Sequence, residues 1–131
     1  MVVFLDTSAL YALADRDDLN HTHAKTLFEN AQQQETTYLL HNYILLECAA
    51  LFSRRLGPAA ARRLLQEAEA FRVRWVDERL HCQALKEWKS RPARLSFVDQ
   101  VSFAVMREAK VHIALAFDDD FKKEGFSFYS G

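Results

Sequence analysis

Short runs rich in apolar residues, one of them (71–76) alternating between apolar and polar, are separated along this chain by longer segments in which apolar residues recur every three or four positions. Val2–Leu5 is such a run, rich in β-branched residues, and is typical of a strand buried in a parallel sheet. Residues 21–31 have their apolar side chains on one helical face, and the Gly57-Pro58 pair separates two further helices. The pattern predicts strands at 2–5, 36–40, 71–76, 112–117 and 126–128, and helices at 9–13, 21–31, 42–56, 58–70, 78–89 and 96–109.

Strands that alternate with helices predict an α/β fold with a mainly parallel sheet. A length of 131 residues with only three Gly and two Pro fits a single domain spanning residues 1–131. Cys48 and Cys82 lack the spacing of a disulfide framework or a zinc site, which favours a reducing compartment. The apolar runs are too short for a membrane helix and no signal peptide is visible, so we expect a cytoplasmic protein that makes no membrane contact.

The charges are unevenly distributed along the chain. The chain has 17 Lys/Arg and 18 Asp/Glu, a net charge of −1, which by itself argues against a protein that binds nucleic acid through bulk charge. From Arg54 to Arg94, however, the chain has 11 basic and 5 acidic residues, a net charge of +6, which leaves −7 for the remaining residues. Such a basic middle can attract a polyanion, although solvated helix faces would produce the same count.

Two acidic residues follow or interrupt apolar segments in the first half of the chain. Asp6 comes directly after the first predicted strand, where it can cap the next helix or face a ligand. Glu47 lies among apolar and aromatic residues in segment 43–52, so we expect a helix that is buried on most faces. A buried carboxylate needs a proton, a metal ion or a basic partner, and Arg54 is one candidate for that partner.

Acidic residues occupy equivalent positions in the second half. Asp99 opens an apolar helix, and with Ser96 it resembles a capping box, which would satisfy the helix start. The first turn of a helix also attracts anionic ligands, so both roles are compatible. Residues 118–120 are all Asp and follow a predicted strand as Asp6 does. They indicate either a turn or a nearby cation.

In a parallel sheet these acidic positions can meet at one edge. Crowded carboxylates repel one another unless a cation neutralises them. Oxygen ligands without Cys or His select a hard ion, Mg²⁺ or Mn²⁺, which also accepts phosphate oxygens as ligands. Such an ion turns water into a nucleophile and stabilises in-line displacement at phosphorus. The sequence therefore predicts metal-dependent hydrolysis of phosphodiesters.

The segments that carry these acids resemble the four motifs of the PIN-domain nucleases, in the same order and spacing. They read VVFLDTSAL at 2–10, ILLECAA at 44–50, LSFVD at 95–99 and AFDDDF at 116–121. The likeness is nearest to the VapC-type toxins of bacterial and archaeal toxin–antitoxin pairs and spans essentially the whole chain. It implies a three-layer α/β/α sandwich and a Mg²⁺- or Mn²⁺-dependent endoribonuclease, with an antitoxin partner and a homodimeric assembly.

The resemblance also implies roles for individual residues. The catalytic acids would be Asp6, Glu47, Asp99 and Asp118, with Ser8 and Ser96 as supporting hydroxyls. The metal ligands would be Asp6, Asp99 and Asp118, with Glu47 and Asp120 as further candidates. Ala116 departs from the family pattern, because many members carry Thr or Ser there, and this leaves the fourth acid open between Asp118 and Asp120. Asp118 is favoured because it lies at the strand end.

The sequence thus predicts an endoribonuclease that acts as a toxin, with the basic middle of the chain contacting RNA phosphates. Two alternatives stay open. The first is a PIN fold that has lost catalysis and serves as an interaction module, which the departure at Ala116 would allow. The second is an RNA-processing PIN nuclease that has no antitoxin.

Overall fold

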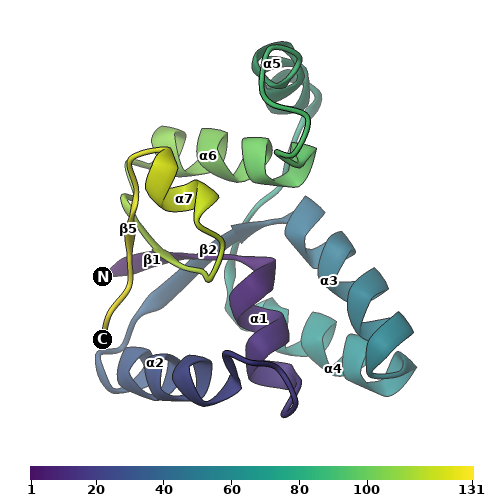
Figure 1. Ribbon diagram of the computed structural model, residues 1–131, viewed down its shortest axis with the longest axis vertical. Coiled ribbons are helices and arrows are strands. Elements are labelled where there is room, and N and C mark those ends of the chain that lie inside the picture. Colours follow the sequence, from purple (N-terminus) through teal and green to yellow (C-terminus); the bar gives the residue numbers. More distant parts are fainter.

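Five parallel strands form one sheet in the computed structural model, which describes all of residues 1–131 (Figure 1). The order across the sheet is β3-β2-β1-β4-β5. From β1 the chain winds outward to β2 and β3 on one side, and then crosses to β4 and β5 on the other. The strands are β1 (Val2–Leu5), β2 (Thr37–His41), β3 (Arg72–Arg74), β4 (Ile113–Leu115) and β5 (Ser127–Phe128).

Helices cover both faces of this sheet. In Figure 1, α1 and α2 lie below β1, whereas α6 and α7 lie above it, and α5 extends beyond α6. This is the three-layer α/β/α sandwich that the family resemblance implied. The helices are α1 (Thr7–Ala14), α2 (His21–Gln33), α3 (Asn42–Arg55), α4 (Pro58–Glu67), α5 (Glu78–Trp88), α6 (Phe97–Ala109) and α7 (Asp120–Lys123), with a 3₁₀ turn at Ala68–Ala70.

The central strands are apolar because helices bury both of their faces. Val3, Phe4 and Leu5 are completely inaccessible to solvent and belong to a continuous core of 30 buried residues. Phe103 of α6 and Phe121 of α7 join this core, and their rings lie 5.2 Å apart between centroids. The Phe121 ring also packs 6.0 Å from that of Phe4. The short helix α7 is therefore fixed to the centre of the molecule by one buried side chain.

The predicted elements match the structure closely, with one exception. All five strands are present, although β3 and β4 are shorter than the predicted segments 71–76 and 112–117. The sequence did not predict α7, because residues 118–120 indicated only a turn or a nearby cation after the strand. A four-residue helix is too short to show a helical repeat of apolar positions, and Phe121 is its only buried residue.

Side chains cap four of the helices, and two of these caps belong to the acidic motifs. Asp6 caps α1, Ser96 caps α6 and Asp77 caps α5. His41 is the completely buried last residue of β2, and its side chain caps α3. None of the helices combines the length and the hydropathy needed to cross a membrane.

Candidate active site

The carboxyl ends of β1 and β4 meet where the winding of the chain changes sides. Leu5 is paired with Leu115 in the sheet, and the Asp6 amide donates a hydrogen bond to the Leu115 carbonyl at 3.2 Å. Asp6 and Asp118 therefore leave adjacent strands at the same edge. In open parallel sheets this switch point is the usual place for ligands, because the loops on either side diverge there.

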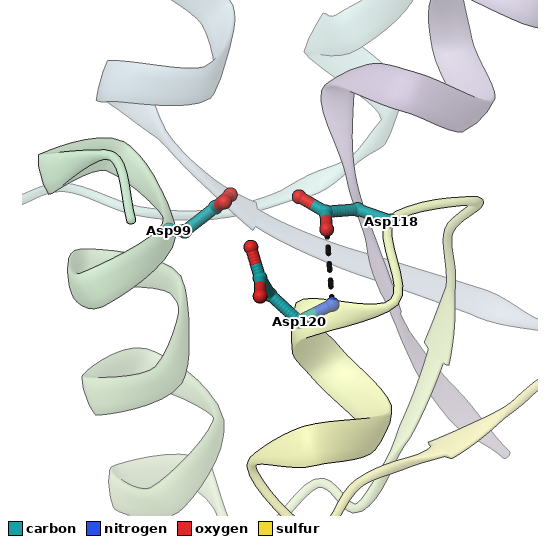
Figure 2. A group of neighbouring side chains, drawn as sticks. All are labelled: Asp99, Asp118 and Asp120. Carbon is teal, nitrogen blue, oxygen red and sulfur yellow. Dashed lines mark hydrogen bonds between the residues drawn. The ribbon is translucent and has the colours of Figure 1, made fainter. Parts of the chain in front are cut away.

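Three carboxylates converge at this edge. Oxygen atoms of Asp99, Asp118 and Asp120 all lie within 4.8 Å of one another, and the three side chains are half-buried. Figure 2 shows Asp99 reaching from α6 toward Asp118 and Asp120, which precede and begin α7. The amide of Asp120 donates to the Asp118 carboxylate at 3.0 Å, which holds the loop before α7 in place. The group is acidic throughout, as the sequence predicted.

The cap of α6 determines where Asp99 points. The Ser96 hydroxyl accepts the Asp99 amide hydrogen at 3.1 Å, which is one half of a capping box. The reciprocal bond from the Asp99 carboxylate is not made, and this carboxylate faces the cluster instead. Ser96 thus fixes the backbone at Asp99, and the Asp99 carboxylate is not used in the helix cap.

Asp6 lies next to this cluster and is the most buried of the acids, with 3% of its surface exposed. Its carboxylate accepts two hydrogen bonds from Ser8, at 2.6 Å from the hydroxyl and 3.1 Å from the amide. The Ser8 hydroxyl in turn accepts the Phe117 amide hydrogen at 2.9 Å. Ser8 therefore joins the start of α1 to the segment after β4, next to the position where Ala116 lacks a hydroxyl.

The electrostatics of the acids are those of a crowded, poorly hydrated site. Burial raises the pKa of Asp6 from 3.8 to about 6, the charges of Asp118 and Glu47 add to the rise, and the Ser8 hydrogen bonds oppose it. Burial is also the main cause that raises the pKa of Asp99 to about 8, followed by the charges of Asp6 and Asp118. These carboxyl groups bind protons more tightly than exposed ones do. A bound cation would offset the same two costs, the burial of the negative charges and their mutual repulsion.

Glu47 stands at the side of the site and is less buried than expected. The prediction that α3 is buried on most faces is wrong, because Leu46 is 72% exposed and Glu47 is half-buried. Glu47 forms no ion pair with Arg54. It accepts a hydrogen bond of 2.5 Å from the Thr7 hydroxyl instead. Sequence reasoning missed Thr7, although its place between Asp6 and Ser8 in the first motif was a usable signal.

The donor set fits a hard divalent cation. The converging groups are carboxylate oxygens, without sulfur or imidazole, and such oxygens are the ligands that Mg²⁺ and Mn²⁺ prefer. Asp120 differs from the other acids because its carboxylate also accepts a hydrogen bond of 2.8 Å from Arg94. Asp99 and Asp118 make no ion pair with any basic side chain.

Comparison with known proteins places this arrangement in a family. The model of the PIN domain matches residues 3–126, which include the entire acidic cluster. The chain is a member of the PIN-domain family. The resemblance predicted from the sequence is thereby confirmed, and so is the fold that it implied.

Two relatives of this PIN domain are the 23S rRNA-specific endonucleases VapC20 of Mycobacterium tuberculosis strains CDC 1551 and H37Rv. Each is 36% identical over 129 residues, which is 95% of this chain and 95% of the relative. The crystal structure of M. tuberculosis VapC20, described as a toxin that cleaves the sarcin–ricin loop, superposes with a TM-score of 0.84. It has 34% identity and covers 96% of both chains. The prediction of an RNA endonuclease of the VapC kind is confirmed at this level.

Proposed function

We propose that this PIN domain is a divalent-metal-dependent endoribonuclease that cleaves 23S rRNA and acts as the toxin of a toxin–antitoxin pair. The observation that carries the proposal is the convergence of Asp99, Asp118 and Asp120 at the switch point beside Asp6, in a chain 36% identical to an rRNA endonuclease. The 23S rRNA and its sarcin–ricin loop are the substrate named for the relatives, and they are the first substrates to test here.

Asp6, Asp99 and Asp118 would hold the ion, with Mg²⁺ or Mn²⁺ as the metal. Bound there, a divalent cation supplies the positive charge that activates water and stabilises the charge that develops on the phosphate. Ser8 holds Asp6 in one orientation through two hydrogen bonds, so that this buried carboxylate needs little reorganisation. The Ser96 cap does the same for the backbone of Asp99.

Glu47 is proposed to orient the attacking water and to accept its proton. The Thr7 hydroxyl donates to one carboxylate oxygen of Glu47, which leaves the other oxygen available to a water molecule. Thr7 lies between Asp6 and Ser8 in the chain. The same short segment therefore positions Asp6 for the ion and Glu47 for the water. Thr7 is thus a positioning residue in this proposal.

The acidic site repels RNA, so a basic rim is a physical requirement. The predicted source is the basic middle of the chain from Arg54 to Arg94. Ion pairs engage part of this segment, because Arg74 contacts Glu108 and Arg91 contacts Glu124. The other basic residues of the segment are the candidates for phosphate contacts.

A protein antitoxin and a homodimeric assembly belong to the same proposal, by resemblance to the VapC toxins. Co-expression with the product of the neighbouring reading frame, followed by affinity purification, tests the antitoxin. Light scattering during size-exclusion chromatography tests the dimer. An RNA-processing enzyme would instead purify without a partner and remain harmless when expressed alone.

The test of the function is cleavage of ribosomal RNA with mapping of the new ends. Purified protein is incubated with ribosomes and with protein-free 23S rRNA in the presence of Mn²⁺, and the 5′ ends are sequenced. We expect one dominant cut that requires Mn²⁺ and disappears in Asp6→Asn. An equal pattern of ends for the variant would refute the assignment, and a cut outside 23S rRNA would refute the substrate.

A further inference from the structure

Arg94 is the only basic side chain that forms an ion pair with a member of the acidic cluster. It lies in the loop between α5 and α6, two residues before the Ser96 cap and five before Asp99. Its terminal nitrogen donates to the Asp120 carboxylate at 2.8 Å. The guanidinium is thereby fixed at the edge of the group of carboxylates that Figure 2 shows.

The donors of Arg94 are mostly unused. An arginine offers five N–H groups in a planar fork, and within the protein Arg94 makes a single hydrogen bond, from one nitrogen. Its side chain is 60% exposed, while that of Asp120 is 18% exposed. The guanidinium is thus anchored on its inner side and open to solvent on its outer side.

A purely structural role does not account for this arrangement. The helix α7 is already attached to the rest of the protein by the buried ring of Phe121. Glu124, which follows α7, also forms ion pairs with Arg91 and Arg107. The Glu124 side chain is 11% exposed and is held by two arginines, so α7 does not depend on Arg94 for its attachment. An ion pair as exposed as that of Arg94 adds little to folding stability.

We propose that Arg94 binds a phosphate oxygen of the RNA beside the scissile bond, and that Asp120 is the positioning residue that holds it there. The inference rests on the proposed function. A phosphodiester that approaches Asp99 and Asp118 meets two negative side chains, and a planar guanidinium at their edge offsets that repulsion with paired N–H donors. In this assignment Asp120 acts through Arg94, and the ion is held by the other acids.

RNA binding tests the role of Arg94 separately from catalysis. A fluorescein-labelled RNA hairpin with the sarcin–ricin loop sequence is titrated with Arg94→Ala, Arg94→Lys, Asp120→Asn and Arg16→Ala in EDTA, so that the RNA stays intact. Arg16 is a matched control, because it is exposed, forms no ion pair and lies beyond the far end of α1 from Asp6. Fluorescence anisotropy gives the dissociation constants at several salt concentrations.

We expect Arg94→Ala to weaken binding roughly 10- to 100-fold, because it removes charge-assisted hydrogen bonds. The slope of the logarithm of the association constant against the logarithm of salt concentration should become less steep by about 0.7 to 0.9, as expected for the loss of one phosphate contact. Arg94→Lys should recover part of the affinity, and Asp120→Asn should cost up to about 5-fold, since the cation remains but loses its anchor. The dissociation constant of Arg16→Ala should stay within about twofold of the wild-type value, because this variant loses only a distant charge.

A second readout separates the two roles open to Asp120. The increase in Tm on adding Mn²⁺ should persist in Arg94→Ala and in Asp120→Asn, and should be lost in Asp118→Asn. The double variant Arg94→Ala/Asp120→Asn should bind the RNA hairpin no more weakly than Arg94→Ala alone.

Several outcomes would overturn the inference. If Arg94→Ala binds the RNA hairpin like the wild type while the wild type cleaves RNA, Arg94 has no substrate contact and the proposed function stands. If Asp120→Asn abolishes the Mn²⁺ shift, Asp120 is a metal ligand and not the anchor of Arg94. If the wild type neither binds nor cleaves RNA, the proposed function fails together with the inference.

Discussion

Replacing Asp99 by Asn should stabilise the metal-free protein while it abolishes activity. Burial and the charges of Asp6 and Asp118 raise the pKa of Asp99 from 3.8 to about 8. The folded state therefore binds this proton more tightly than the unfolded chain does. Raising the pH from about 4 to about 8 strips the proton from the unfolded chain first, and the folded protein loses stability throughout that window. Asparagine is uncharged at every pH and avoids this loss.

The structure sets the size of the effect. At about 1.4 kcal/mol per pH unit, a pKa rise from 3.8 to about 8 corresponds to an upper limit of about 6 kcal/mol in the free energy of unfolding. The amide remains partly buried, and the neighbouring carboxylates relax when Asp99 is neutral, so we expect about 1–3 kcal/mol at pH 8. For a chain of this length that is an increase in Tm of about 3–10 °C.

Urea unfolding in EDTA at pH 5 and pH 8 measures this effect. Asp119→Asn is the matched control, because Asp119 is exposed and its side chain makes no hydrogen bond. The increase in the free energy of unfolding caused by Asp99→Asn should be smaller at pH 5 than at pH 8. Addition of Mn²⁺ should stabilise the wild type but not the variant. A variant that is less stable than the wild type at pH 8 in EDTA would refute the argument that the acids are crowded and lack a countercharge.

Three further predictions concern the residues around the acids. Thr7→Val removes the hydrogen bond to Glu47 and should lower kcat for RNA cleavage roughly 10-fold or more with little change in KM, whereas Thr7→Ser should retain most of the activity. Ser8→Ala leaves the Phe117 amide without its acceptor and should lower the free energy of unfolding by about 1–3 kcal/mol, measured in urea; an unchanged midpoint would argue against the bridge. Burial lowers the pKa of His41 to about 3, so the wild type should lose stability as the pH falls from about 6.5 toward 3, and His41→Asn should show a shallower acid profile by circular dichroism.

The fold was predictable because its central strands are buried on both faces. Apolar runs such as Val2–Leu5, each followed by an acidic residue or a helix cap, mark the strand ends of a parallel α/β fold. The gathering of acids at one edge follows from that topology. The end residues of adjacent parallel strands meet whatever their separation in the sequence.

The finer structure of the site was not predictable, because it depends on side-chain contacts between distant segments. The hydrogen bond between Thr7 and Glu47 joins residues 40 positions apart, and that between Ser8 and Phe117 joins residues 109 apart. Neither hydrogen bond produces a repeating pattern of residues from which it could be predicted. The apolar neighbours of Glu47 suggested deep burial, but the composition of a segment does not say which of its sides meets solvent, and Leu46 lies exposed beside it.

The ambiguity between Asp118 and Asp120 also came from information that the sequence lacks. Both side chains reach the cluster, so position alone does not separate them. The ion pair with Arg94 does distinguish them, and it depends on a loop that the sequence marks only by its polar residues and Pro92.

The most direct test of the central claim is the single-turnover rate of RNA cleavage as a function of Mn²⁺ concentration, for the wild type and Asp118→Asn. The substrate is an end-labelled hairpin with the sarcin–ricin loop sequence. We predict saturable, Mn²⁺-dependent cleavage by the wild type, no cleavage in EDTA, and a rate for the variant that is lower by roughly 100-fold or more, as expected when a metal site or its support is lost. Cleavage at the wild-type rate in EDTA, or by Asp118→Asn, would contradict the assignment of this acidic cluster as the catalytic centre.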